Sequence, residues 1–143
     1  MWQKDKKTIF DFDMVFFPIN WRQEHWALAV VDFREQGIFY YDSLAHLNYH
    51  DQEYLTRIVT YIEKEHMTKI QQPIDTTFWR LETVQDVPRQ NNGVDCGVFL
   101  CKYMDFLSTD EKLAFQHTDI QTYRSQIIYE IVTGSLINRV DQN

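Results

Sequence analysis

The sequence has no cluster of basic side chains and no long apolar run. Its 14 Lys and Arg residues are outnumbered by 21 Asp and Glu residues, which gives a net charge of −7. Because phosphate binding requires grouped positive charge, nucleic acid is excluded as the main partner. No apolar stretch approaches the roughly 18 residues of a membrane span, and the N-terminus lacks the apolar core of a signal peptide. We therefore expect no membrane association and an intracellular location, in the nucleus, the cytoplasm or both.

Cysteine, glycine and proline are also scarce. The chain of 143 residues has 2 Cys, 4 Gly and 3 Pro, and it contains no repeat and no low-complexity segment. The spacing between Cys96 and Cys101 does not match a zinc ligand pair, and two cysteines make no disulfide framework, which fits a reducing compartment. Cys101 lies within an apolar run and is expected in the core. This length indicates one domain with a sizeable core, and we expect a monomer.

The order of apolar patterns predicts an α+β fold, with a mainly antiparallel sheet packed against a central helix. Residues 26–31 and 38–42 are expected to form a hairpin that turns near Arg34–Gly37. Further strands are expected at 14–19, with Pro18 near the end, and at 78–84. Helical spacing of apolar residues covers 51–67 and 96–108, and a last helix is expected after the caps Thr118 and Asp119, with Gly134 weakening or ending it.

Cys96 is the first candidate for chemistry. Turn residues precede Asp95-Cys96-Gly97, and an apolar run with helical spacing follows, so the thiol lies at or near the first turn of a buried helix. A helix N-terminus favours the thiolate, and Gly97 allows close approach of other backbone. Taken alone, a cysteine in such a place more often only packs in the core. A nucleophilic role would require a histidine from elsewhere in the chain.

His25 and Asp42 lie near one end of the expected hairpin, because paired residue numbers in that register add up to roughly 70. An aspartate that accepts the Nδ1–H of the imidazole would fix its tautomer and stabilise the imidazolium ion. Gln90, in the loop before Cys96, could donate to an oxyanion together with the backbone N–H of Cys96. Each residue has a plainer reading, as a surface or capping histidine, an Asx turn or a polar loop, and spacing alone does not bring them together. The remaining four histidines, His46, His50, His66 and His117, are read as surface or capping residues.

Two segments together carry a resemblance to a known family. They are F-F-P-I-N…E-H-W-A-L-A-V-V-D-F-R…I-F-Y-Y-D-S-L and V-P-R-Q-N-N-G-V-D-C-G-V-F-L-C-K-Y-M-D. The chain resembles the ubiquitin-like-protein-specific (SUMO/sentrin-specific) cysteine proteases, of the adenain-like, papain-related class. The order His, Asp, Gln, Cys is the signature of that family.

The resemblance implies a role for each matched residue. Cys96 matches the nucleophile, His25 the general base and acid, Asp42 the residue that orients the imidazole, and Gln90 the oxyanion donor. Trp26 matches the indole that lies over the substrate's Gly-Gly tail, which suits a narrow tunnel because glycine has no side chain. No metal ion, nucleotide or other cofactor is implied.

The implied function is a protease or isopeptidase acting after the C-terminal Gly-Gly of a ubiquitin-like modifier, with SUMO and its conjugates as the expected partners. The resemblance also implies that 1–143 is one catalytic domain lacking the family's N-terminal lobe, which carries a second tunnel tryptophan that Trp2 and Trp21 are not placed to replace. Arg89 stands where the family often has Gln. The alternatives are a protease for NEDD8 or ubiquitin, and a truncated, non-catalytic module that binds a ubiquitin-like protein.

Overall fold

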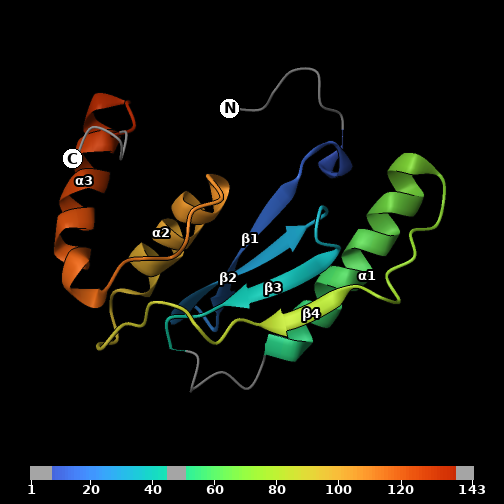
Figure 1. Ribbon diagram of the computed structural model, residues 1–143, viewed down its shortest axis with the longest axis horizontal. Coiled ribbons are helices and arrows are strands. Elements are labelled where there is room, and N and C mark those ends of the chain that lie inside the picture. The colour runs from blue at the N-terminus through green and yellow to red at the C-terminus, as the bar shows by residue number, and fades with distance from the viewer. Residues whose placement is uncertain (1–7, 45–50, 138–143) are drawn as a thin grey trace.

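The structure is a computed structural model that describes residues 8–44 and 51–137. A four-stranded sheet is combined with three α-helices and two short 3-10 helices (Figure 1). In chain order the elements are η1 (Ile9–Asp11), β1 (Met14–Trp21), β2 (His25–Asp32), β3 (Gly37–Tyr41), α1 (Asp51–Ile70), β4 (Arg80–Thr83), α2 (Cys96–Ser108), η3 (His117–Asp119) and α3 (Ile120–Thr133).

The sheet has the strand order β1-β2-β3-β4. The β1–β2 and β2–β3 pairs are antiparallel, whereas β4 lies parallel to β3. A parallel neighbour requires a crossover, and α1 provides it between β3 and β4. The α+β class and the mainly antiparallel sheet are therefore confirmed, with one parallel pair that makes the sheet mixed.

The β2–β3 hairpin has the expected register to within one residue. Leu28 pairs with Tyr41, and Asp32 pairs with Gly37 next to the turn. The turn is fixed by the Asp32 carboxylate, which accepts from the backbone N–H of Arg34 at 2.9 Å and of Glu35 at 3.2 Å. This register places the start of β2 close to the residues that follow β3, which is where the site lies.

β1 is longer than its apolar run indicated. It continues to Trp21, and Pro18 lies inside it opposite Leu28. An edge strand tolerates proline because one side of its backbone has no ladder partner to lose. The expected end of this strand at residue 19, near Pro18, was therefore two residues too early.

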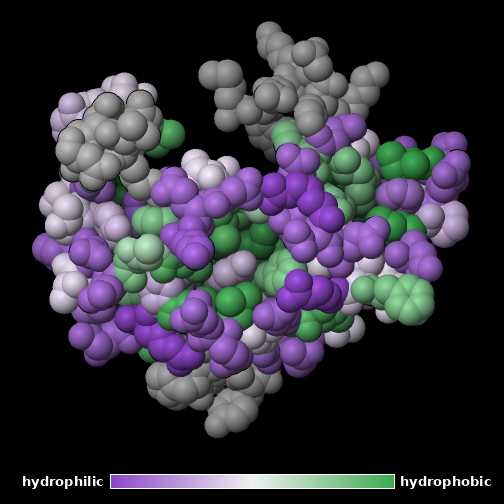
Figure 2. Space-filling view, viewed as in Figure 1, coloured by the Kyte–Doolittle hydropathy of each residue, from purple (hydrophilic) through white to green (hydrophobic). Residues whose placement is uncertain are grey.

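The two faces of the sheet build two separate cores. On β2 the alternating residues Leu28 and Val30 pack with α2, whereas Ala29 and Val31 pack with α1. Figure 1 shows α1 on one side of the sheet and α2 with α3 on the other. Figure 2 shows the surface of the molecule from the same viewpoint: most of it is hydrophilic, and hydrophobic side chains are visible near the middle. The completely buried ring of Phe99 anchors α2 in the first core, so the helix that begins with Cys96 is held by core packing.

The helices begin and end close to the predicted residues, with some corrections. α1 runs to Ile70 instead of Met67, and α3 begins after Asp119 and ends at Gly134, whose φ of +66° is the left-handed conformation that glycine favours. Asp119 does not cap α3 with its side chain, which accepts instead from the backbone N–H of Gln116 at 2.8 Å.

Candidate active site

His25 and Asp42 meet as the sequence predicted. His25 Nε2 lies 2.7 Å from Asp42 Oδ1, and the two side chains are 15% and 1% exposed. The same carboxylate oxygen accepts from the backbone N–H of Leu44 at 2.7 Å, so its orientation is fixed on two sides. The expectation that Nδ1 would face the carboxylate is wrong, because the ring uses Nε2. Nδ1 is thereby the ring nitrogen that remains for a second partner.

Cys96 is the first residue of α2 and is 6% exposed. Contact between α2 and β2 brings this end of the helix to the start of the strand: a Cβ added at Gly97 would lie 3.8 Å from Cδ1 of Trp26. Gly97 directly follows Cys96, and Trp26 directly follows His25. Because Gly97 and Trp26 lie in contact, their chain neighbours Cys96 and His25 lie at the same end of the α2–β2 interface.

Gln90 is held in place by its neighbours and is only 6% exposed. Its backbone N–H donates to the carbonyl of Ser43 at 3.2 Å, and its side-chain oxygen accepts from the Ser43 hydroxyl. Its Nε2 donates to the carbonyl of Asn92 at 2.5 Å. A primary amide carries two N–H groups, so one remains as a candidate oxyanion donor. The loop is anchored further by the Tyr103 hydroxyl, which donates to the carbonyl of Pro88 at 2.5 Å.

Trp26 is 40% exposed although it borders the core. Indole rings usually bury most of their surface, so an exposed one beside Gly97 is available to cover a bound segment. Trp21 pairs with His25 across the β1–β2 connection, and the guanidinium of Arg22 lies 4.8 Å from the centre of its ring. Trp2 lies outside the described residues.

Sequence reasoning missed a polar cluster around Asp95. The Asp95 carboxylate accepts from Nε of Arg124 at 3.1 Å and also from its Nη2, while its other oxygen accepts from Nδ2 of Asn92 at 2.7 Å. The donors of Arg124 and Asn92 hold the pKa of Asp95 below its usual range. No local pattern links Arg124, which is 29 residues further along the chain, to this loop.

The other histidines have three different outcomes. His117 was read as a surface or capping residue, but its Nδ1 accepts from the backbone N–H of Asn91 at 3.3 Å and its Nε2 lies 3.8 Å from Asp95. Nδ1 of His66 lies 2.7 Å from the carbonyl of Gln72, as a local capping residue would. His46 and His50 lie outside the described residues.

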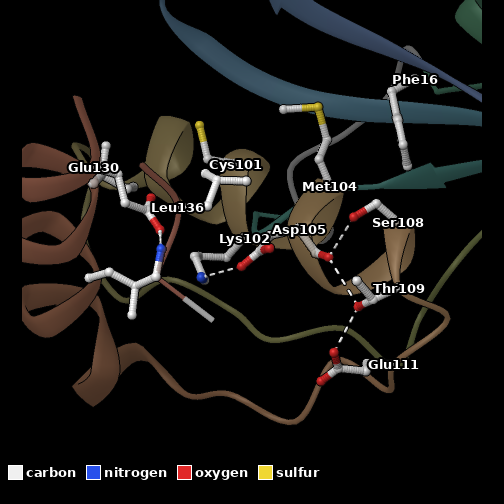
Figure 3. Close-up of a pocket in the computed structure, with 12 residues that line it drawn as sticks. Phe16, Cys101, Lys102, Met104, Asp105, Ser108, Thr109, Glu111, Glu130 and Leu136 are labelled. Atoms are coloured by element: carbon white, nitrogen blue, oxygen red, sulfur yellow. Dashed lines mark hydrogen bonds and ion pairs between the residues drawn. The ribbon is translucent and has the colours of Figure 1, made fainter. Parts of the chain in front are cut away.

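Cys101 is exposed, so its expected place in the core is wrong. Cys101 lines a separate pocket of about 550 Å³, together with Met104 of α2 and Leu136, which follows α3 (Figure 3). None of the candidate site residues lines this pocket. Partial burial raises the pKa of the Cys101 thiol, which disfavours its thiolate. Among the residues that the structure describes, no helix is long and apolar enough to cross a membrane.

Comparison with known proteins identifies the family. Residues 1–136 match the Ulp1 protease family, C-terminal catalytic domain. The chain belongs to the Ulp1 protease family. Among curated members, it is 37% identical over 134 residues to the ubiquitin-like-specific protease ESD4 of Arabidopsis thaliana, covering 92% of this chain and 27% of that protein. It is 30% identical over 132 residues to human sentrin-specific protease 2, covering 91% of this chain and 22% of that protein.

Solved structures of Ulp1 proteases share the fold. The C-terminal Ulp1 protease domain in complex with Smt3, the yeast ortholog of SUMO, matches with a TM-score of 0.74 and 32% identity, covering 89% of this chain and 55% of that one. A SUMO protease Ulp1 with its catalytic cysteine oxidised to a sulfonic acid matches with a TM-score of 0.79 and 32% identity, covering 90% and 56%. The chain therefore spans about half the length of these solved proteases, and the family resemblance seen in the sequence is confirmed.

Proposed function

We propose that this chain is a cysteine protease or isopeptidase that cuts after the C-terminal Gly-Gly of SUMO, in its precursor or in its conjugates, and that residues 1–143 act as a single catalytic domain. The observation that carries the proposal is the hydrogen bond of His25 to the buried Asp42, at the same end of the α2–β2 interface as Cys96. Curated relatives named for ubiquitin-like modifiers and for sentrin, and a solved relative bound to Smt3, support SUMO as the substrate.

The first half of the proposed reaction forms a thioester. The thiolate of Cys96 attacks the carbonyl carbon of the terminal glycine, and the carbonyl oxygen becomes an oxyanion. The second N–H of the Gln90 amide and the backbone N–H of Cys96 donate to it. The C–N bond then breaks, and the imidazolium of His25 gives its proton to the leaving amine.

The second half releases the modifier. His25, now neutral, takes a proton from water, the hydroxide oxygen bonds to the thioester carbon, and the C–S bond breaks to restore the thiolate and imidazolium. Asp42 holds the ring and stabilises its positive charge in both halves. Trp26 covers the Gly-Gly tail, where any side chain would collide with the indole.

The experiment is a comparison of fluorogenic C-terminal conjugates of SUMO, NEDD8 and ubiquitin, with the Cys96→Ala variant as the control. The proposal expects fastest cleavage of the SUMO conjugate and none by the variant. Faster cleavage of the NEDD8 or ubiquitin conjugate would assign the same chemistry to another modifier. Cleavage by the variant at an undiminished rate would contradict the mechanism, and a folded wild-type chain that cleaves nothing but binds SUMO would be a binding module.

A further inference from the structure

Asp95 is a buried carboxylate in an unfavourable place for the proposed chemistry. It directly precedes Cys96 and is 7% exposed. A negative charge beside a thiol opposes formation of the thiolate, and one beside an oxyanion opposes its formation too. A site that depends on both species therefore needs that charge to be compensated.

Arg124 of α3 supplies the compensation. Its Nε and Nη2 both donate to Asp95 Oδ1, and its Nη2 also donates to the carbonyl of Val94 at 3.4 Å. The only other titratable group that the structure records at this carboxylate, within its described residues, is His117 of η3, with Nε2 at 3.8 Å from Oδ2. At the same end of α2 as Cys96 lies the His25–Asp42 pair.

The contact with Arg124 also determines where the Asp95 side chain points. Asp95 is the N-cap residue of α2, a position where aspartate usually accepts from the helix N–H groups. Here its side chain makes no capping hydrogen bond. Its two oxygens accept from Arg124 and Asn92 instead, so they are not used by the N–H groups at the start of the helix.

A chain of hydrogen bonds connects this ion pair to the rest of the site. Asn92 donates to Asp95, and its side-chain oxygen accepts from the backbone N–H groups of Val94 at 3.0 Å and Asp95 at 3.2 Å. The backbone carbonyl of Asn92 accepts from Gln90, and Gln90 in turn is bonded to Ser43, the neighbour of Asp42. These bonds link α3 to the loop that carries Gln90 and to Ser43, just after β3.

We propose that Arg124 is a positioning residue of this protease: it neutralises Asp95 beside Cys96 and turns that carboxylate away from the helix N–H groups, so that thiolate and oxyanion can form there. The inference rests on the proposed role of Cys96 as nucleophile. It adds to that role a residue of α3 that acts through its ion pair with Asp95.

The test measures alkylation of Cys96 by iodoacetamide against pH, in a Cys101→Ser background. In Arg124→Met the pH midpoint of the reaction is expected to move upward by about one unit, because an uncompensated carboxylate then lies next to the thiol. Asp95→Asn, which removes the charge, is expected to leave the midpoint in place or lower it, and the double variant should return to within a few tenths of the starting value. Arg57→Met is the matched control, since it removes an arginine from an exposed pair with Glu53.

An upward shift in Arg124→Met without an upward shift in Asp95→Asn would distinguish charge compensation from mere loosening of the loop, which would move both midpoints in one direction. On the SUMO conjugate, kcat is expected to fall at least tenfold in Arg124→Met with KM nearly unchanged, and Arg124→Lys should restore part of it. If Arg124→Met fails to fold, Arg124→Gln, which also removes the positive charge, takes its place in the comparison with Asp95→Asn. Equal midpoints in Arg124→Met and Arg57→Met, or equal shifts in Asp95→Asn and Arg124→Met, would overturn the inference. Failure of the proposed nucleophile would show separately, as cleavage by Cys96→Ala.

Discussion

The hydrogen bond between His25 and Asp42 allows a quantitative test of the proposed catalytic roles. Asp42→Asn removes the negative charge but keeps an oxygen that can accept from the Leu44 N–H, so the local turn has a partner after substitution. The substitution removes the charge from the 2.7 Å hydrogen bond to the imidazole of His25. The Asp42 side chain is 1% exposed, so water does not replace this interaction. Hydrogen bonds to charged groups contribute about 1.5–3 kcal/mol. If the imidazolium is present in the rate-limiting transition state, kcat/KM should fall about 10- to 150-fold.

The assay is steady-state cleavage of the SUMO fluorogenic conjugate, with thermal unfolding measured on the same samples. Asp75→Asn is the matched control, because Asp75 also accepts from the backbone N–H two residues ahead, that of Thr77, at 2.9 Å, but lies on the surface. The control should retain full activity. A fall of less than about threefold in Asp42→Asn, at unchanged stability, would refute the assigned role of the carboxylate.

Three further predictions follow from the same structure. Cys96→Ala should abolish cleavage of the SUMO conjugate, whereas Cys101→Ala should cleave it at nearly the wild-type rate. Loss of cleavage in Cys101→Ala but not in Cys96→Ala would identify Cys101 as the nucleophile. Phe99→Ala should lower the free energy of unfolding by about 3–5 kcal/mol in urea titrations, because the ring is completely buried; a change below about 1 kcal/mol would contradict that packing. Arg124 and Asn92 lower the pKa of Asp95 in the folded state. Its carboxylate therefore stabilises the fold fully above the unfolded pKa of about 3.9, and this stabilisation is lost as the pH falls through the lower folded value. The stability difference between wild type and Asp95→Asn should therefore shrink as the pH of the urea titration falls from 6 to 2, and a constant difference would contradict it.

The sequence alone predicts those parts of the fold that depend on short-range patterns. The hairpin register follows from two apolar runs and one turn, and it correctly brought His25 and Asp42 together. The helix headed by Cys96 follows from apolar spacing after a turn-rich loop. These features are encoded within a few tens of residues, so local reasoning is sufficient.

Features decided by tertiary contacts could not be predicted in this way. Pro18 stays inside β1 because that strand lies at the sheet edge, which only the complete strand order reveals. Cys101 has the sequence context of a core residue but lies on the exposed side of α2. The choice of Nε2 by His25 depends on ring orientation, and the contact between Asp95 and Arg124 joins a loop to a distant helix. The contributions to the site that were missed therefore come from long-range polar pairing.

The central claim is that Cys96 and His25 act as a nucleophile and its base on a Gly-Gly carbonyl. The most direct measurement is incubation of the protein with SUMO carrying a C-terminal vinyl sulfone, followed by mass spectrometry of the modified peptide. The account predicts a covalent adduct on Cys96, slowed at least tenfold in His25→Ala and formed more slowly with the NEDD8 reagent at the same concentration. An adduct on Cys101, or one on Cys96 formed at the same rate without His25, would contradict it.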